Sequence, residues 1–280
     1  MSYYKGENMI NITEEELRSL TEYIQKNYGL NLTKKKTLIE GRLNNLLIEK
    51  GFTSFSQYIS HVFADQTSSE LATMMNKLTT NHTFFMRESN HFNYLKEFVL
   101  PQITRTMKEK DFRIWSAGCS SGEEPYTLSM ILQDYFGEQA KLWDAKVLAT
   151  DISLKALDTA KLGIYTAEAV ESLPNVWKQK YFTKLESEHF KINDKISNEV
   201  IFRTFNLMEN VYPFKKKFNV IFCRNVMIYF NQQTKIELVN KFYENTEPGG
   251  YLFIGHSESI NKETTKYKYI MPAVYQKEML

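Results

Sequence analysis

The residues best suited to chemistry lie in one short segment, residues 115–126, with the sequence W-S-A-G-C-S-S-G-E-E-P-Y. An apolar run before it predicts a buried strand at 112–116, and the run after it predicts a helix at 125–136. A strand, a glycine-bearing turn and a helix, in this order, hold nucleotide-like ligands in α/β proteins. Gly118 and Gly122 allow tight backbone geometry and close approach of a ligand to the main chain.

Two acidic residues inside this loop restrict the kind of ligand. Glu123 and Glu124 would repel a phosphate, so the ligand should be cationic, or at least not anionic, on that side. S-adenosylmethionine meets this condition because it carries an amino group and a sulfonium and no phosphate. A nicotinamide dinucleotide is the alternative from the same strand, loop and helix, but the acidic pair argues against its pyrophosphate.

Asp151 supplies a second indication of a nucleoside. It ends an apolar run that predicts a strand at 146–151, about one βαβ unit beyond the glycine loop. An acidic residue there accepts hydrogen bonds from ribose hydroxyls in dinucleotide-binding folds. Alternatively, Asp151 only caps the helix that begins near Leu154. The glycine loop upstream favours the ribose role.

The segment 78–88, L-T-T-N-H-T-F-F-M-R-E, carries polar side chains among aromatic ones. Asn81, Thr83 and Arg87 stand at spacings of two and four, which allow them to converge on one site. Arg87 offers a planar fork of donors suited to a carboxylate. The alternative is that Arg87 forms an ion pair with Glu88 or Glu123 that locks two domains together.

A further group follows the strand predicted at 219–224, in the sequence N-V-I-F-C-R-N-V-M-I-Y-F. Arg224 and Asn225 emerge at its carboxyl end, where open α/β sheets bind ligands. Tyr229 follows four residues later and could reach the same edge, or could be a core aromatic with its hydroxyl at the surface. The pair Asn206-Leu207 ends another strand-like run and is a candidate to line an adenine pocket.

Elements of two kinds position these residues. Apolar spacing over the first eighty residues predicts four short helices in a small bundle, with a capping box at Thr13 and Glu16 and a cap at Thr67 and Glu70 for the fourth helix. After about residue 110, strands alternate with helices, which predicts a mostly parallel sheet covered by helices. The predicted elements of this second part are strands at 112–116, 146–151, 219–224 and 251–255 and helices at 125–136, 154–162 and 232–245.

Composition limits the class of protein. The formal charge of +2 over 280 residues argues against a general nucleic-acid binder, and no apolar run approaches the ~20 residues of a membrane span. The first residues lack the apolar core of a signal peptide, and two cysteines are too few for a disulfide framework, so a cytoplasmic setting is expected. The five histidines have no H-E-x-x-H or H-x-x-x-H spacing, and no metal site is predicted.

Four blocks of the sequence agree with one family. The blocks are L-T-T-N-x-T with F-F-M-R-E, S-A-G-C-S-S-G-E-E-P-Y, A-T-D-I-S, and I-F-C-R-N-V-M-I-Y-F with G-H-S-E. Together they resemble the chemotaxis receptor methyltransferases, the CheR family, over about residues 10–276. The resemblance implies an all-α N-terminal domain at 1–85 for receptor recognition. It also implies a Rossmann-like class I methyltransferase domain at 86–280, with a small β subdomain inserted at about 178–204.

The resemblance also implies an activity: methyl transfer from S-adenosylmethionine to glutamate side chains of methyl-accepting chemotaxis proteins. The products would be glutamyl 5-O-methyl esters and S-adenosylhomocysteine. Arg87 and Tyr229 would lie nearest the chemistry. The residues expected at the cofactor are Asn81, Thr83, Arg87, Gly118, Glu124, Asp151, Asn206, Leu207, Arg224 and Asn225.

The expected partner is the acidic helical bundle of a receptor's cytoplasmic part. The enzyme itself is expected to be a monomer. Lys34, Arg42 and Asn45 lie away from the apolar side of the second helix and form a candidate docking face, or else an ordinary solvated face. Family members that bind a receptor's C-terminal tail have a glycine-bearing loop in the β subdomain. Residues 183–200 contain no glycine, so direct docking on the receptor helices is expected instead.

A catalytically silent receptor-binding module is the alternative from another functional class. The presence of Arg87, Glu124, Asp151 and Tyr229 argues against it.

Overall fold

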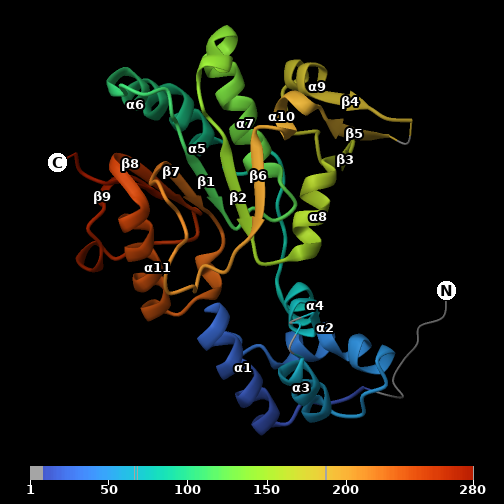
Figure 1. Cartoon of the computed structure of the whole chain (residues 1–280). Helices are drawn as coiled ribbons and strands as arrows, with labels where there is room; N and C mark the ends of the chain where they lie inside the picture. The colour runs from blue at the N-terminus through green and yellow to red at the C-terminus, as the bar shows by residue number, and fades with distance from the viewer. Residues whose placement is uncertain (1–8, 66, 68, 187, 280) are drawn as a thin grey trace. The chain divides into compact units, whose positions relative to one another are not determined.

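The computed structural model describes residues 9–65, 67, 69–186 and 188–279, and Figure 1 shows its elements. The chain forms two compact units. The helical unit comprises residues up to Thr80 together with Tyr229–Asn231, and the sheet unit comprises Asn81–Ile228 and Gln232–Leu280. The division falls after Thr80 rather than after residue 85, so the segment with Asn81 and Thr83 belongs to the sheet unit.

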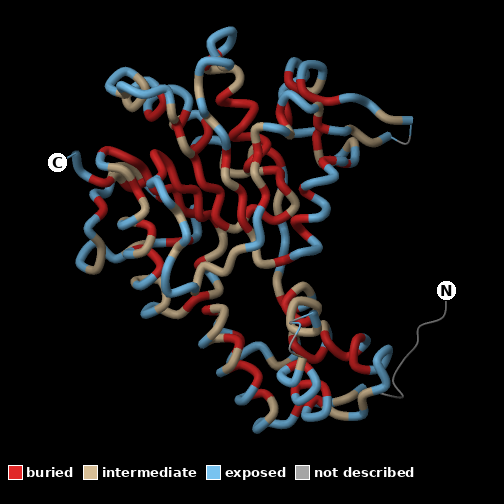
Figure 2. Tube along the Cα trace, viewed as in Figure 1, coloured by how far each residue is buried: buried red, intermediate tan, exposed pale blue. Residues whose placement is uncertain are grey.

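The helical unit contains the four predicted helices α1 Glu14–Tyr28, α2 Lys36–Glu49, α3 Phe55–Ala64 and α4 Ser69–Leu78. Buried and exposed positions alternate along each helix (Figure 2), because each buries one apolar face in a common core. The predicted capping box is present: Thr13 Oγ1 accepts from the N–H of Glu16, and Glu16 accepts from the N–H of Thr13. Gly29, with φ of 74°, ends α1 in the left-handed conformation.

The predicted cap of α4 is confirmed only in part, because Thr67 Oγ1 accepts the N–H of Ser69, at 3.4 Å, and not that of Glu70. Asp65, rather than Thr67, accepts the N–H of Glu70, at 2.8 Å, and the other oxygen of Asp65 accepts the N–H and hydroxyl of Thr67. These hydrogen bonds lower the pKa of Asp65 to about 2. The carboxylate of Asp65 reaches the first turn from outside the helix, which spacing from Thr67 to Glu70 could not indicate.

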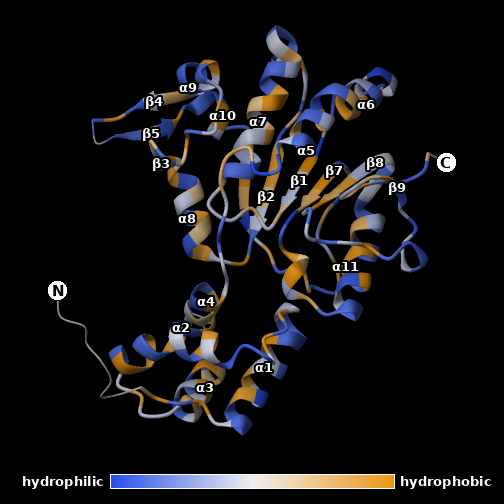
Figure 3. Ribbon diagram, turned by 180° about the vertical axis from the view of Figure 1, so that it is seen from behind, coloured by the Kyte–Doolittle hydropathy of each residue, from blue (hydrophilic) through white to orange (hydrophobic). Residues whose placement is uncertain are grey.

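The sheet unit is built on a seven-stranded sheet in the order β6-β2-β1-β7-β8-β10-β9. The first five strands run parallel, as predicted. β10 runs antiparallel to both β8 and β9, and β9 forms the edge of the sheet. Hydrophobic residues prevail in β2 and β7 (Figure 3), and every residue of β7 is buried. The strands are β1 Ile114–Ala117, β2 Val147–Asp151, β6 Val200–Thr204, β7 Phe218–Cys223, β8 Thr246–Ile254, β9 Lys268–Met271 and β10 Val274–Gln276.

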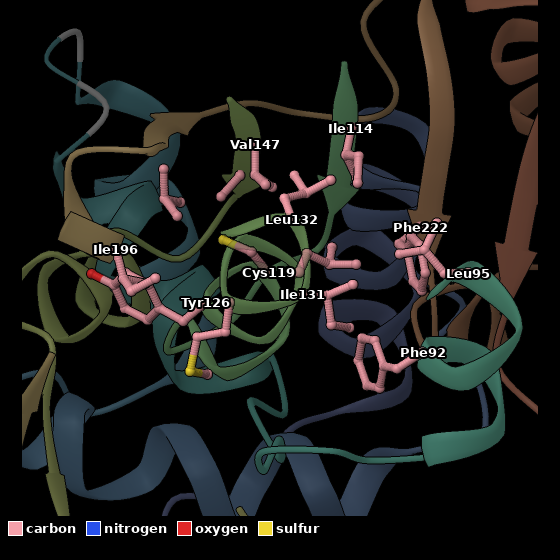
Figure 4. Close-up of a cluster of buried hydrophobic side chains, with 14 of the residues drawn as sticks. Phe92, Leu95, Ile114, Cys119, Tyr126, Ile131, Leu132, Val147, Ile196 and Phe222 are labelled. Carbon is pink, nitrogen blue, oxygen red and sulfur yellow. The ribbon is translucent and has the colours of Figure 1, made fainter. Parts of the chain in front are cut away.

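Three predicted helices follow strands: α7 Glu123–Phe136, α8 Leu154–Leu162 and α11 Gln232–Asn245. The sequence did not predict the helical stretch that precedes β1, formed by α5 Ser89–Tyr94, the π-helix η1 Leu95–Val99 and α6 Leu100–Thr106. The wider π turn shifts the apolar spacing, which hides this stretch from a 3.6-residue pattern. Figure 4 shows the packing that results, with Phe92 and Leu95 in one apolar cluster with side chains of β1, β2, β7 and α7.

A small antiparallel sheet is inserted in this unit, in the order β3-β5-β4. Its strands are β3 Ile164–Thr166, β4 Phe182–Lys184 and β5 His189–Ile192, with α9 Asn175–Tyr181 between the first two and α10 Asp194–Ser197 after the last. The predicted bounds of 178–204 are therefore wrong at both ends. Residues 200–204 form β6 at the edge of the main sheet, where one solvated face produces an alternation like that of an insert.

The insert is fastened to α7 through one carboxylate. Asp134 accepts hydrogen bonds from Trp177 Nε1, Lys180 Nζ and the Tyr181 hydroxyl, each within 2.6 Å. Burial alone would raise the pKa of Asp134, but these three donors hold it below its ordinary value. The remaining 3-10 turns are η2 Gly137–Leu142, η3 Met227–Tyr229 and η4 Lys262–Thr264. Among the described residues, no helix combines the length and the apolar character that a membrane crossing requires.

Candidate active site

The site begins at the carboxyl ends of the parallel strands. From β1 the chain goes on to β2 and β6 on one side, and later returns to β7 and β8 on the other. The loops after β1 and β7 therefore part from each other at a topological switch point, where open α/β sheets bind ligands. We call the residues gathered there the strand-end site. They are Asn81, Arg87, Glu88, Gly118, Ser120, Glu124, Asp151, Arg224, Asn225 and Glu258.

Arg224 is the centre of the strand-end site. It follows β7, and its guanidinium is almost entirely buried, with 2% of the side chain exposed. Its Nη1 lies 3.1 Å from Glu124 Oε2, and its Nη2 lies 3.1 Å from Glu88 Oε2. It also donates to the carbonyl oxygen of Arg87. One cation thus links the loop after β1, the loop after β7 and the segment before α5.

The pKa values of the two carboxylates that share Arg224 are shifted in opposite directions. Burial raises the pKa of Glu124, although Arg224 and the hydroxyl of Ser116, at 2.7 Å, partly oppose this. Burial alone would raise the pKa of Glu88 too, but Arg224 and hydrogen bonds from His256 N–H and Asn225 hold it below its ordinary value. Glu124 is therefore a carboxylate for which a further cation would be favourable.

Asp151 holds the glycine loop and does not cap the following helix. Its Oδ2 accepts the N–H of Ser120 at 2.8 Å, and its Oδ1 accepts the N–H of Ser153 at 2.9 Å. Ser153 is the N-cap of α8, because its hydroxyl oxygen accepts the N–H of Ala156. Each carboxylate oxygen has two lone pairs, so Asp151 can still accept from the hydroxyls of a ligand.

The loops of the strand-end site adopt backbone conformations that side chains rarely tolerate. Met86, Glu88, Ser120 and Asn225 have φ between 50° and 59°. Gly118 has φ of 97°, and a Cβ there would come within 2.4 Å of Val226 Cγ2. Such conformations persist where the surroundings over-determine them, as at ligand sites.

Glu258 is a site residue that the sequence did not indicate by itself. It is buried, and it accepts the N–H groups of Asn225 at 2.9 Å, Gly255 at 2.6 Å and Ile228 at 3.1 Å. These bonds hold Asn225 in its left-handed conformation beside Arg224. The only available signal was that G-H-S-E follows a parallel strand and so reaches the same edge of the sheet.

The segment before α5 meets the glycine loop. Asn81 Nδ2 lies 3.3 Å from Ser153 Oγ, and the carbonyl oxygen of Asn81 accepts the hydroxyl of Ser120 at 3.2 Å. Arg87 donates to the carbonyl of His82 at 2.8 Å and lies over the ring of Phe84. Within the described chain, Arg87 forms no ion pair with Glu88 or Glu123, so the domain-locking alternative is wrong. Thr83 is half-buried in the same segment.

Comparison with known proteins agrees with this geometry. Residues 81–275 match the family model described as CheR methyltransferase, SAM binding domain, and residues 15–79 match CheR methyltransferase, all-alpha domain. A chemotaxis protein methyltransferase of Borreliella burgdorferi is 44% identical over 96% of each chain. The chemotaxis protein methyltransferase of Escherichia coli is 34% identical over 89% of this chain and 86% of that protein.

The chain belongs to the CheR methyltransferase family. It is an S-adenosylmethionine-dependent enzyme, and the dinucleotide and catalytically silent alternatives find no support. The residues present fit the cofactor. Carboxylates outnumber cations in the strand-end site, which suits a ligand carrying an ammonium and a sulfonium, and Asp151 offers acceptors for ribose hydroxyls.

Asn206 and Leu207 are expected at the cofactor of a CheR enzyme, and Tyr229 is expected near the chemistry. Asn206 and Leu207 follow β6, next to β2 in the sheet. Asn206 accepts the N–H of Met208, and the carbonyl of Leu207 accepts the hydroxyl of Tyr212. Tyr229 belongs to the helical unit, where its carbonyl accepts the N–H of Asn31 at 2.8 Å.

The candidate docking residues of the CheR all-α domain are not equivalent. Lys34 and Asn45 are exposed. Arg42 donates to the carbonyls of Leu78 and Thr79, at 2.7 and 3.1 Å, and so closes the end of α4. Arg42 therefore has a structural role that sequence spacing did not show.

Proposed function

We propose that the enzyme methylates glutamate side chains of methyl-accepting chemotaxis receptors. It would act in the cytoplasm, as a monomer, on the helical bundle of the receptor. The observation that carries this proposal is the anionic strand-end site, with Glu124 and Asp151 at the switch point, in a chain whose relatives are named chemotaxis protein methyltransferases.

The reaction needs no general base. A glutamate acceptor has an ordinary pKa of about 4.3 and is ionised at neutral pH. Its carboxylate oxygen forms a bond to the methyl carbon while the carbon–sulfur bond breaks, and the electron pair stays on sulfur, so no proton moves. When bound, S-adenosylmethionine supplies the activated methyl group. The protein's task is alignment, which can contribute roughly 7–11 kcal/mol to lowering the barrier.

Exclusion of water is the second contribution. The carboxylate and the sulfonium both lose charge in the transition state, so a dry site favours reaction over the hydrated ground state. Burial of Arg224 and Glu124 supports a site of this kind, since both have less than 15% of the side chain exposed.

Arg87 and Tyr229 are proposed to orient the incoming glutamate. Arg87 is half-buried, and its Nη1 donates to the backbone carbonyl of His82, so the other N–H groups of its fork can face a carboxylate. Arg87→Ala and Tyr229→Phe should each lower turnover more than cofactor affinity. Turnover equal to that of the wild type in both variants would contradict this role.

The α2 side of the helical unit is the proposed receptor-docking face. A basic surface attracts the acidic receptor bundle, so Lys34→Glu should weaken receptor methylation and leave cofactor binding intact. Lys26→Glu, at an exposed position of α1, is the matched control. Arg42→Glu should also destabilise the helical unit because it removes the closure of α4. Receptor methylation unchanged by Lys34→Glu would reject the docking face.

The test of the proposed function is a methyl-transfer assay. Wild-type enzyme and the Arg87→Ala variant are incubated with receptor-containing membranes and S-adenosylmethionine carrying a labelled methyl group. We expect labelled receptor whose label is released by mild alkali as methanol, because carboxylate esters hydrolyse and methylated amines do not. Alkali-stable label, or no label on receptors, would overturn the proposal.

A further inference from the structure

His91 is a buried side chain whose hydrogen-bonding groups are left unsatisfied by the described residues. It is fully buried in α5, and neither of its ring nitrogens has a hydrogen-bond partner within the described part of the chain. Buried polar groups are almost always satisfied by protein, water or an ion. Its ring lies edge-on to His256, with centroids 4.6 Å apart, and its Nδ1 is 3.5 Å from Glu88 Oε2.

The ligand atoms of Glu88, His91 and His256 all lie within 4.8 Å of one another. We propose that these three residues bind a divalent transition-metal ion of the zinc class at the edge of the strand-end site. Two imidazoles and one carboxylate are a common ligand set for such ions, and they leave a position open for water. At metal–ligand distances of about 2.0–2.1 Å, tetrahedral geometry places ligand atoms ~3.3 Å apart, so the trio must close slightly.

The fold brings the three residues together from distant parts of the sequence. Glu88 precedes α5 with a left-handed φ of 54°, and His91 follows three residues later, on the same side of the turn. His256 follows β8, and its N–H donates to Glu88 Oε1 at 3.2 Å. His256 is exposed, which gives an ion access from solvent and lets this ring move to close the site.

The charges around the trio suit a cation. Glu88 and Glu124 share one guanidinium, that of Arg224, which leaves an excess of one negative charge in this cluster. Because Glu88 is shared with Arg224, we expect affinity in the micromolar range, about 1–100 μM.

The sequence alone predicts no metal site because known metal-binding motifs place histidines close together, whereas these two lie far apart along the chain. Residues 91 and 256 meet only after the sheet has formed. Metal binding by these residues does not require a methyl acceptor, so it can be measured without methyl transfer.

The experiment uses the full chain without a histidine tag, treated with a chelator and then freed of it. Co²⁺ binding is followed by visible absorption and Zn²⁺ binding by calorimetry. The wild type should bind one equivalent of either ion. His256→Ala and Glu88→Gln should each weaken binding at least tenfold, with the fold checked by circular dichroism.

His61→Ala is the matched control. His61 is also an exposed histidine near a carboxylate, 4.0 Å from Glu70, but no second histidine joins it in a ligand cluster among the described residues. Binding by this variant should equal that of the wild type. Absence of saturable binding to the wild type, or binding undiminished in His256→Ala, would overturn the metal site.

Discussion

The helical unit buries apolar side chains, whereas the strand-end site buries charged side chains. In the described residues up to Thr80, only glycines have positive φ, and the core is an apolar cluster that helical spacing predicts. The strand-end site contains three non-glycine residues with positive φ and four acidic side chains held around Arg224 or by backbone N–H groups. Regular packing stabilises the first region, whereas the second keeps strained and charged groups in place for a ligand.

The largest expected effect comes from removing the cation of the strand-end site. Arg224→Ala leaves Glu88 and Glu124 buried without their partner, which should lower the free energy of unfolding by about 3–5 kcal/mol. Chemical denaturation measures this loss, and calorimetry with S-adenosylhomocysteine should show weaker binding. A loss below about 1 kcal/mol would show that the carboxylates are not held by Arg224.

A pair of glycines separates backbone strain from close packing. Gly51 and Gly118 both have positive φ, but a Cβ at Gly51 meets nothing within 4 Å, whereas one at Gly118 clashes with Val226. Gly51→Ala should lower the unfolding free energy by about 1 kcal/mol. Gly118→Ala should lower the unfolding free energy by roughly 1–3 kcal/mol more than Gly51→Ala does, because its new Cβ also overpacks against Val226. Equal losses in the two variants would contradict the comparison.

Two helix caps offer a smaller test of the same difference. Thr13 caps α1 at an exposed position, and Ser153 caps α8 while fully buried. Thr13→Ala should cost about 1 kcal/mol of stability. Ser153→Ala should cost about 2 kcal/mol, because the buried N–H of Ala156 cannot turn to water. Thermal unfolding of both variants gives the comparison, and a larger loss in Thr13→Ala would reverse it.

The smallest effects are expected in the acid dependence of stability. Asp65 and Asp134 both have folded-state pKa values below their ordinary values, so their stabilisation is present above about pH 4 and is lost as the pH falls through the folded pKa. Asp134→Asn should flatten this decline more than Asp65→Asn, since Asp65 is more open to solvent. Denaturation midpoints between pH 2 and 5 measure the slopes, and equal slopes in all three proteins would refute the assignment.

The sequence predictions succeed where packing is regular and apolar, and they fail where contacts depend on the assembled sheet. Apolar spacing located α1 to α4, the central parallel strands and α8, because each buries one regular face. It missed α5 and α6, where a π turn and Pro101 break the spacing, and it misplaced the insert, whose strands are only three or four residues long. Sequence motifs found Glu124, Asp151, Arg224 and Asn225. They could not show that Glu258 braces Asn225, or that His91 meets His256, because those contacts depend on the assembled sheet.

The central claim is that the strand-end site binds S-adenosylmethionine through carboxylates placed for a cationic nucleoside. Calorimetric titration of S-adenosylhomocysteine and NAD into the wild type, Asp151→Asn and the control Asp134→Asn tests it most directly. We predict one bound S-adenosylhomocysteine per chain and no saturable heat with NAD. Asp151→Asn should bind at least tenfold more weakly, about 1.4 kcal/mol, and Asp134→Asn should bind as the wild type does. Saturable binding of NAD, or unchanged affinity in a folded Asp151→Asn variant, would contradict the account.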